Sequence, residues 1–371
     1  MNGVIKKIRK SGIKWFVWRA QKEMRSPSNP YIMKTMNGYL NLKKKFFLNK
    51  INNQEDKLLY AVYDLEIAPI TFNITEFLLD SEYEANKLGK EGFVVVFVPR
   101  KGDSLYGWKE YDSIFDSDSK IWRFHNIVLP ITLLAVKCKG IYILPDRSDV
   151  FELVKKHEVY PSSYDGINLR YIDIVKFYEK LDKPNLVKGL GASKEGIRYI
   201  EDWLEKNKID SPIVTITLRQ SDFDPARNNR IEDWKRFCGY LIEKGYFPVI
   251  VPDTDNSYKT KDLFSEVYIF NECCWNMGLR MALYEKSFVN FFVASGPLML
   301  ASGNERVRYI AMNMLPKDSL VTTKEAYEKV KHNIGDNYKW AWPKQHLVYK
   351  PDSYENILSQ FNDFVKEEKN Q

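Results

Sequence analysis

Polar residues follow the ends of three apolar runs in the second half of the chain: Arg219 and Gln220, Asp253, and Ser295 with Gly296. Open parallel sheets bind ligands at the carboxyl ends of their strands, so residues in such places are candidates for ligand contacts. Arginine makes bidentate contacts with phosphate oxygens, and glycine lets a ligand approach the backbone closely. These residue types predict a phosphate-binding site, with ordinary loops and a helix N-cap as the alternative.

The segment FVNFFVASGPLMLA (288–301) is the most specific of these features. An apolar strand is expected to break at Ser295-Gly296-Pro297 and to continue directly as a helix. The start of a helix presents N–H groups without intrahelical partners and a partial positive charge, which together attract phosphate. Arg219 and Arg280 are predicted to complete a clamp on a diphosphate at this turn.

The elements that must position these residues follow an alternating pattern. From residue 58, short apolar runs alternate with longer helical periodicity, which is typical of βαβ units and a parallel sheet. Strands are expected over 58–63, 93–99, 141–145, 213–219, 247–252, 288–294 and 308–311. Helices are expected over 73–89, 121–137, 193–207, 230–244, 275–286 and 352–367, with 150–179 helical apart from a break at Tyr160-Pro161.

This pattern predicts an α/β protein made of two Rossmann-like domains that face each other across a cleft. The first domain is placed at 51–208 and the second, ligand-binding domain at 209–371. The length of 371 residues agrees with two domains of roughly 150 to 200 residues each. The last helix is expected to cross back to the first domain.

Residues 1–50 form a basic arm that precedes the first domain. They contain 13 Lys and Arg and a single acid, Glu23, so their net charge is +12, whereas the other 321 residues carry −5. Within 3–24 the apolar side chains fall on one face of a predicted amphipathic helix. Such a helix is typical of binding to an anionic membrane surface, with a solvated helix packed on the body as the alternative. The acidic body makes nucleic acid an unlikely partner.

Several protein classes are excluded by what the sequence lacks. There is no apolar run of about 18 residues and no secretory signal pattern. The four cysteines form no CxxC pair, which favours a reduced, cytoplasmic protein. The motifs GxGxxG, GxxxxGK[ST], GxSxG and HExxH are also missing, which argues against dinucleotide-binding proteins, P-loop NTPases, α/β-hydrolases and zincins.

The second half resembles the donor-binding domain of GT-B glycosyltransferases over about 210–315. The resemblance rests on VTITLRQSDFDPARNN (214–229) and NECCWNMGLRMALYEKSFVNFFVASGPLML (271–300). The Ser-Gly-Pro turn is similar to that of bacterial heptosyltransferases, and the Leu-Arg turn with the GLRMALYE helix is similar to fucosyltransferases. The sequence departs from the heptosyltransferase pattern at 298–300, where Leu-Met-Leu stands in place of a histidine.

The resemblance implies transfer of a sugar from a nucleotide-sugar donor to a glycan or lipid-linked acceptor, in the synthesis of cell-surface polysaccharide or lipopolysaccharide. The basic arm predicts a location at the inner face of the cytoplasmic membrane. The transferred sugar would be a hexose, a deoxyhexose or a heptose. The donor contacts it implies are Arg219, Gln220, Asp253, Arg280, Ser295 and Gly296. No cofactor is implied, because side chains and helix dipoles stabilise the leaving diphosphate in this fold, and a metal ion is unlikely.

Transfer with inversion needs a base to take the proton of the acceptor hydroxyl. Asp64 and Glu66, which follow the first strand, are the predicted catalytic residues, with Asp103 and His125 as further candidates. The alternative is that each of these groups is a capping or salt-bridged residue of the surface.

Three DxD sequences, Asp116-Ser117-Asp118, Asp222-Phe223-Asp224 and Asp253-Thr254-Asp255, leave metal-assisted chemistry as a weaker possibility. Two other functions also remain open. One is a nucleotide-sugar epimerase of the same architecture, and the other is a non-catalytic protein that binds RNA or lipid through the arm.

Overall fold

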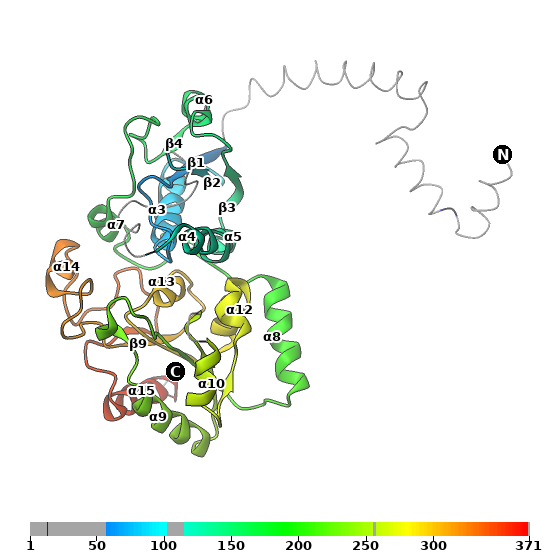
Figure 1. Cartoon of the computed structure of the whole chain (residues 1–371), viewed down its shortest axis with the longest axis vertical. Helices are drawn as coiled ribbons and strands as arrows, with labels where there is room; N and C mark the ends of the chain where they lie inside the picture. Colours follow the sequence, from blue (N-terminus) through cyan, green and yellow to red (C-terminus); the bar gives the residue numbers. More distant parts are fainter. Residues whose placement is uncertain (1–12, 14–56, 102–114, 255–256, 370–371) are drawn as a thin grey trace. The chain divides into compact units, whose positions relative to one another are not determined.

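The computed structural model describes residues 13, 57–101, 115–254 and 257–369. The predicted basic arm lies outside the described residues apart from Ile13. Asp103 and Asp255 lie outside them as well. The account below concerns residues 57–369 (Figure 1).

The first sheet is parallel, with strand order β3-β2-β1-β4. Its strands are β1 (Leu58–Asp64), β2 (Gly92–Val98), β3 (Cys138–Ile143) and β4 (Val159–Tyr160). The β2 sequence GFVVVFV is buried at every position. A run of apolar residues without alternation is what a strand needs when both faces of its sheet are covered. Leu59, Ala61 and Tyr63 of β1 and Phe93, Val95 and Phe97 of β2 belong to the main core.

Helices that follow the first-sheet strands cover its faces (Figure 1). They are α3 (Ile74–Lys87), α4 (Ser117–Arg123), a π-turn (Phe124–Val128), α5 (Leu129–Leu134), α6 (Asp149–Lys156) and α7 (Ile174–Lys180). The helical prediction for 150–179, with its break at Tyr160-Pro161, is therefore confirmed at the two ends, in α6 and α7, and wrong for the residues between them. Val159 and Tyr160 pair with β1 instead, and Asp165 accepts hydrogen bonds from the backbone N–H groups of Ile167 and Asn168, which closes a turn.

The second sheet is also parallel, with order β10-β9-β8-β5-β6-β7. Its strands are β5 (Ile213–Thr217), β6 (Phe247–Val251), β7 (Tyr268–Ile269), β8 (Val289–Val293), β9 (Tyr309–Met312) and β10 (Gln345–Leu347). The two edge strands β7 and β10, of two and three residues, were not predicted. Runs this short have no detectable apolar periodicity.

The helices of the second half are α8 (Lys194–Lys206), α9 (Ile231–Glu243), α10 (Ser257–Leu263), α11 (Glu272–Trp275), α12 (Met277–Lys286), α13 (Gly296–Ser302), α14 (Lys324–Lys329) and α15 (Tyr354–Lys369). The expectation that the C-terminal helix crosses to the first domain is wrong. Ile357, Phe361 and Phe364 of α15 pack with Phe237 and Phe291 in the core of the second half. This core already buries the apolar face of the helix.

Two buried acids, one from each half, hold the segment that joins the halves. The Glu82 carboxylate accepts hydrogen bonds from the N–H groups of Lys188 and Gly189, at 2.7 and 3.0 Å. Glu285 accepts one from Ala192 at 2.7 Å. Gly189 has φ +67°, and a Cβ there would lie 2.2 Å from the carbonyl oxygen of Gly303, so only glycine fits. The connection is thereby anchored to both sheets.

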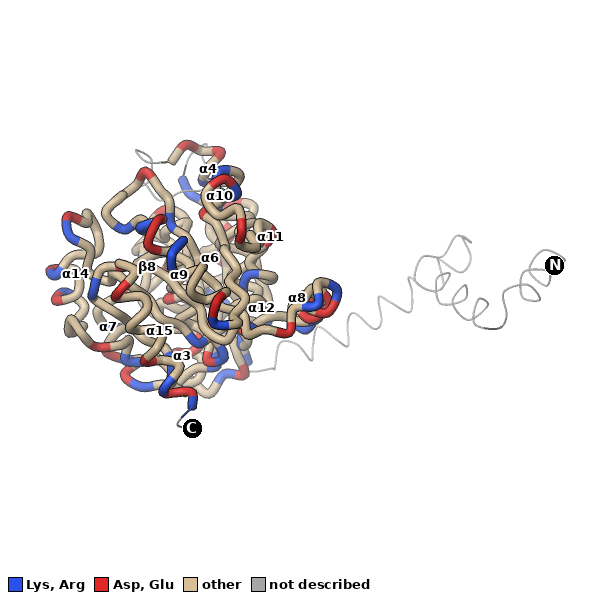
Figure 2. Tube along the Cα trace, turned by 90° about the horizontal axis from the view of Figure 1, so that it is seen from below, with Lys and Arg blue, Asp and Glu red and all other residues tan. Residues whose placement is uncertain are grey.

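Among the described residues, no helix combines the length and apolarity that crossing a membrane requires. On the body, Lys and Arg are interspersed with Asp and Glu in the view of Figure 2. The strongly basic part of the sequence is the arm.

Candidate functional site

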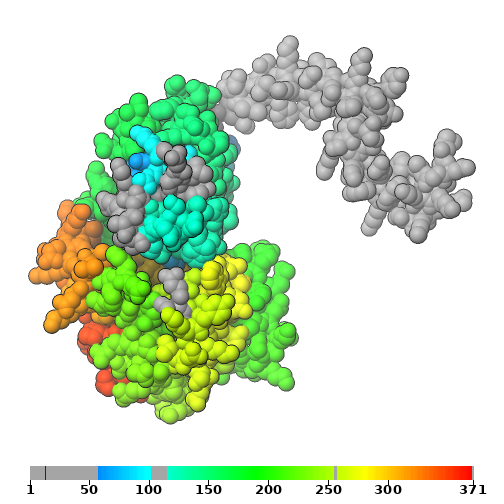
Figure 3. All heavy atoms as spheres, viewed as in Figure 1, coloured from blue at the N-terminus to red at the C-terminus, as the bar shows by residue number. Residues whose placement is uncertain are grey.

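A cavity of about 770 Å³ lies between the carboxyl ends of the strands of the two halves. The second half lines it with residues that follow β5, β6 and β8, and the first half lines it with the loop between β1 and α3, with α4 and with the segment that enters α7. In Figure 3 the α4–α5 surface of the first half meets the green and yellow surface of the second half along the boundary between them. The cavity therefore occupies the place where α/β proteins bind their ligands.

Five of the six predicted donor contacts line this cavity: Arg219, Asp253, Arg280, Ser295 and Gly296. Arg280 on α12 is only 3% exposed, and its Nε donates to the carbonyl oxygen of Cys273 at 2.6 Å. No described residue accepts a hydrogen bond from its Nη groups. The Ser295 side chain does not cap α13, and its Oγ is buried without a hydrogen-bond partner among the described residues. Both groups can therefore bind a ligand without breaking an existing hydrogen bond.

Arg219 also lines the cavity, but its guanidinium group is already bound within its own loop. It donates to the carbonyl oxygens of Phe223 and Asp224 and to Oδ1 of Asn228. Burial and, to a smaller extent, the neighbouring Arg227 lower the pKa of Arg219 to about 10, against the opposing effect of Asp253 and Asp224. The structure therefore places Arg219 as the residue that shapes the loop after β5.

Gln220 does not line the cavity. Its backbone N–H donates to Oδ2 of Asp253 at 3.1 Å, and its side chain donates to the carbonyl oxygens of Arg219 and Asn229. Its contacts therefore join the loops that follow β5 and β6.

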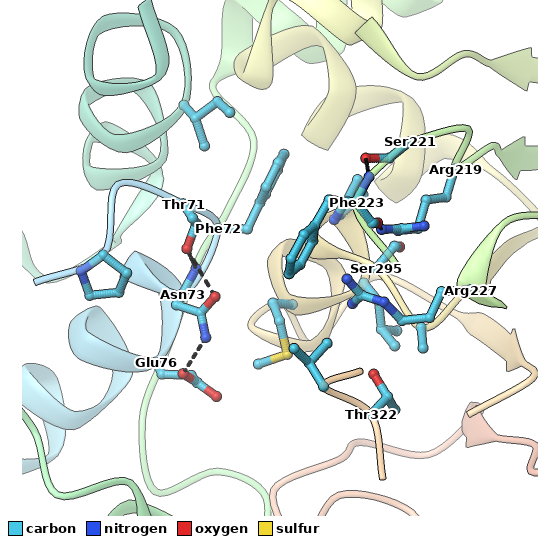
Figure 4. A pocket seen from close by; sticks show the side chains of 18 of the residues that line it. Thr71, Phe72, Asn73, Glu76, Arg219, Ser221, Phe223, Arg227, Ser295 and Thr322 are labelled. Carbon is cyan, nitrogen blue, oxygen red and sulfur yellow. Dashed lines mark hydrogen bonds between the residues drawn. The ribbon is translucent and has the colours of Figure 1, made fainter. Parts of the chain in front are cut away.

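Gly296 is approached by a side chain from the other half. A Cβ at this position would lie 2.5 Å from Cδ2 of Phe72, a residue of the loop between β1 and α3. The Phe72 ring centre is also 6.0 Å from the guanidinium carbon of Arg280. Glycine is thus required here for contact between the halves in this conformation, and Figure 4 shows Phe72 reaching from the first half into the cavity.

The two predicted catalytic acids lie outside the cavity lining. Asp64 is 1% exposed, and its two carboxylate oxygens accept from Nη1 and Nη2 of Arg147 at 2.9 and 2.5 Å. It also accepts from the Tyr164 hydroxyl at 2.6 Å. Glu66 accepts from the N–H of Lys101 and lies 3.9 Å from Arg100. These contacts favour structural roles for both acids. His125, in the π-turn, does not line the cavity either.

Among the described acids of the first half, the one that lines the cavity is Glu76, in the first turn of α3, and the sequence analysis missed it. It is 6% exposed, and burial raises its pKa to about 7, although a hydrogen bond from Asn73 opposes the rise. The available signal was the spacing Asn73-x-x-Glu76, which is close to a helix-capping pattern. Asn73 stands at the N-cap position but makes no capping hydrogen bond with its side chain, because its Oδ1 accepts from the Thr71 hydroxyl. Its amide nitrogen donates to Oε2 of Glu76 at 3.1 Å.

The DxD sequences serve as structural elements where they are described. Asp116 caps α4, and the Asp224 carboxylate binds Ser319, the N–H of Leu320 and Arg227. In the described part of the chain, no group of three or more His, Cys, Asp or Glu side chains is arranged to hold a metal ion. Metal independence stays a prediction.

Two parallel α/β sheets that face a shared cavity define the GT-B fold, and comparison with solved structures agrees. The chain is similar to a family 9 glycosyltransferase from Veillonella parvula DSM 2008, with a TM-score of 0.51 and 10% identity over 84% of this chain and 98% of that one. It is also similar to E. coli ADP-heptose lps heptosyltransferase II, with a TM-score of 0.52 and 11% identity over 84% of this chain and 100% of that one. The predicted GT-B-like fold is confirmed.

No protein-family model matches the chain, and no curated protein matches its sequence. The similarity is therefore one of fold.

Proposed function

We propose that this protein is a glycosyltransferase that moves a sugar from a nucleotide-sugar donor to a hydroxyl group of a glycan or lipid-linked acceptor. The observation that carries the proposal is a cavity, at the carboxyl ends of the strands of a GT-B fold, that places the Arg280 guanidinium in one wall and the Glu76 carboxyl group in another. Transfer from a sugar diphosphate needs positive charge to stabilise the leaving diphosphate, and it needs a base to take the proton of the acceptor hydroxyl.

The second half supplies the donor side of this proposal. The diphosphate lies against Arg280, with the Ser295 hydroxyl as a further donor of a hydrogen bond. Arg280 is buried, so its charge acts in a medium of low dielectric constant and stabilises negative charge more strongly than an exposed arginine would. These side chains hold the leaving group, and the reaction as proposed uses no cofactor and no metal ion.

Glu76 is the base in this proposal, in place of Asp64 and Glu66. The acceptor oxygen attacks the anomeric carbon while the bond from that carbon to the diphosphate oxygen breaks, and the electron pair of that bond stays on the diphosphate. The proton of the acceptor hydroxyl passes to Glu76. A carboxyl group with a pKa of about 7 suits this role, because it is substantially ionised at neutral pH and still holds a proton strongly. A single displacement of this kind inverts the anomeric configuration.

The first experiment is thermal unfolding of the full chain with a panel of nucleoside mono- and diphosphates and nucleotide sugars, each with and without magnesium. A ligand at 100 times its Kd stabilises the folded state by about 2.7 kcal/mol. We expect an increase in Tm with one nucleotide class, independent of magnesium, that is lost in Arg280→Ala. The matched control is Arg236→Ala, since Arg236 is an exposed arginine of the same half.

Each other outcome of this panel has a definite meaning. No shift with any nucleotide contradicts the proposal and favours the alternative of a non-catalytic binding protein. A shift with a nucleotide sugar that is converted to another nucleotide sugar without an acceptor identifies an epimerase. When a donor is found, its sugar decides between hexosyl, deoxyhexosyl and heptosyl transfer, and NMR of the product tests inversion.

The acceptor, we further propose, is presented at the inner face of the cytoplasmic membrane as a precursor of cell-surface polysaccharide or lipopolysaccharide. Support for this comes from the arm of residues 1–50 with its net charge of +12, since each Lys or Arg near an anionic surface adds about 1 kcal/mol of attraction.

The test is flotation of the full chain with vesicles of phosphatidylglycerol and phosphatidylcholine. Vesicles of phosphatidylcholine alone are the control, together with a full-length variant in which Lys6, Lys7 and Lys10 are replaced by Gln. Equal flotation with both vesicle types, or none, contradicts the membrane proposal and leaves the transferase proposal standing.

A further inference from the structure

The loop that carries Phe72 into the cavity also contains a short chain of hydrogen bonds that ends on Glu76. The Thr71 hydroxyl donates to Oδ1 of Asn73 at 2.9 Å, and the Asn73 amide donates to Oε2 of Glu76 at 3.1 Å. Figure 4 shows these three side chains in a row on the first-half wall of the cavity, across from Ser295 and Arg227. All three line the cavity.

Thr71 determines which way the Asn73 amide points. The Thr71 Oγ1 accepts a hydrogen bond from the backbone N–H of Asn73 at 3.2 Å and gives its only proton to Oδ1 of the same residue. The amide nitrogen must then face Glu76. The reverse orientation would place the amide oxygen against a carboxylate oxygen, and this is repulsive when Glu76 is ionised.

The two oxygens of Glu76 are therefore not equivalent. Oε2 accepts from Asn73, whereas no described residue donates to Oε1. Because an oxygen that already accepts a hydrogen bond is less basic, the proton of the neutral acid resides on Oε1.

We propose that Thr71 and Asn73 are positioning residues that act through Glu76: they hold Oε2 and leave Oε1 as the oxygen that takes the proton of the acceptor hydroxyl. This inference rests on the proposed function, in which Glu76 is the base. Asn73 also keeps Glu76 usable near neutral pH, since the hydrogen bond favours the ionised form that burial disfavours.

Among the described residues, no cation is bound to Glu76. Tyr171 just before α7, Tyr178 within α7 and Tyr338 from the second half have their pKa values raised by burial and further by the charge of Glu76. Asp80, one turn further along α3, is paired with Lys180. The hydrogen bond from Asn73 is thus the one described contact that favours ionisation of Glu76, and its removal should be visible in a titration.

The test measures unfolding of the full chain against pH without any ligand. The difference between the wild type and Glu76→Gln grows as the pH rises from 4.5 and levels off near pH 7. The pH at which it levels off is the titration midpoint of Glu76 in the folded state. The same difference is then measured between Asn73→Ala and the double variant Asn73→Ala, Glu76→Gln. Any effect of Asn73 on helix stability cancels in this double-mutant cycle. We expect the midpoint to rise by about one pH unit in Asn73→Ala. Thr71→Val should raise it by less, and Thr71→Ser should leave it unchanged.

The second readout is the pH profile of kcat/KM with the nucleotide sugar that the thermal panel identifies. In Asn73→Ala the acidic limb of this profile should shift to higher pH by the same one unit. The rate should then fall about tenfold at pH 6 and little at pH 9, and the KM for the donor should be unchanged. A merely structural role would lower the rate equally at every pH.

An unchanged midpoint in Asn73→Ala overturns the positioning proposal, whatever the activity. If the midpoint moves as expected while no nucleotide sugar is used, the hydrogen-bond chain is established and the proposed function fails. The two failures are therefore distinguishable.

Discussion

Asp64, at the end of β1, and Glu76, in the first turn of α3, are both buried carboxylic acids of the first half, with exposures of 1% and 6%. They differ in their hydrogen-bond partners. Asp64 accepts two hydrogen bonds from Arg147 and one from the Tyr164 hydroxyl. Glu76 accepts one from the Asn73 amide and faces the cavity. A buried carboxylate with an arginine partner contributes to stability, while one without a cation costs stability and gains reactivity.

The largest effect on stability should come from replacing Asp64, the buried acid whose charge is paired with an arginine. Asp64→Asn leaves the Arg147 guanidinium, whose side chain is 13% exposed, without its counter-charge. We expect a loss of about 3 to 5 kcal/mol in the free energy of unfolding, measured by urea denaturation at pH 7.

A double variant with Arg147→Gln is the informative control for Asp64→Asn. It should lose less than the sum of the two single variants, because it leaves no buried charge. A loss below 1 kcal/mol in Asp64→Asn alone would mean that Asp64 is not structural, and Asp64 would return as a candidate base.

Glu76→Gln should have the opposite effect on stability. The folded-state pKa of Glu76, about 7, lies above its ordinary value of 4.5, so the folded state binds the proton more tightly and wild-type stability falls as the pH rises between these values. Above pH 7, Glu76→Gln should therefore be more stable than the wild type by up to about 3 kcal/mol. The gain should vanish below pH 4.5.

Differential scanning calorimetry at pH 5 and pH 8 measures this difference. Glu232→Gln, at an exposed glutamate of α9, is the matched control and should change stability at neither pH. A Glu76→Gln variant that is less stable than the wild type at pH 8 would show that Glu76 makes a structural contact.

Glu76→Gln should also slow sugar transfer strongly. Positioned bases contribute about 10² to 10⁴ in rate, so we expect Glu76→Gln to lose at least 100-fold in kcat while it keeps the nucleotide-induced shift in Tm. Wild-type kcat/KM should rise with pH up to about 7, because only the ionised acid accepts a proton. Retention of near-normal transfer by Glu76→Gln would remove Glu76 from the mechanism.

The smallest effect concerns the loop that carries Phe72, which precedes α3. Gly296→Ala places a methyl group against the ring of Phe72, and the ring must move. We expect a loss of about 1 to 2 kcal/mol in stability, which Phe72→Ala in the same chain should largely restore. If Phe72→Ala does not restore stability, the loop and the second half are not in contact through this residue in solution.

Most of the fold could be predicted from the sequence, whereas the acid that faces the cavity could not. The fully apolar run of β2 and the Ser-Gly-Pro turn after β8 are local signals, and local signals decide strands, helices and the edge of the sheet where polar residues gather. Asp253, Arg280 and Ser295 were found for this reason, since they follow or flank such elements. The two-residue strand β4 and the placement of α15 were missed, because both depend on packing partners far along the chain.

The sequence by itself determined an α/β protein of two parallel sheets with cationic and hydroxyl side chains at the carboxyl edge of the second. Only the tertiary structure decided which of the described acids of the first half reaches the cavity. Arg147 and Tyr164, which bind Asp64, are 83 and 100 residues away from it in the sequence. In the described part of the chain Glu76 is buried without a cation, and the tyrosines around it come from residues 171–178 and from Tyr338 of the second half. Charge compensation depends on neighbours in space, and residue spacing does not encode those neighbours.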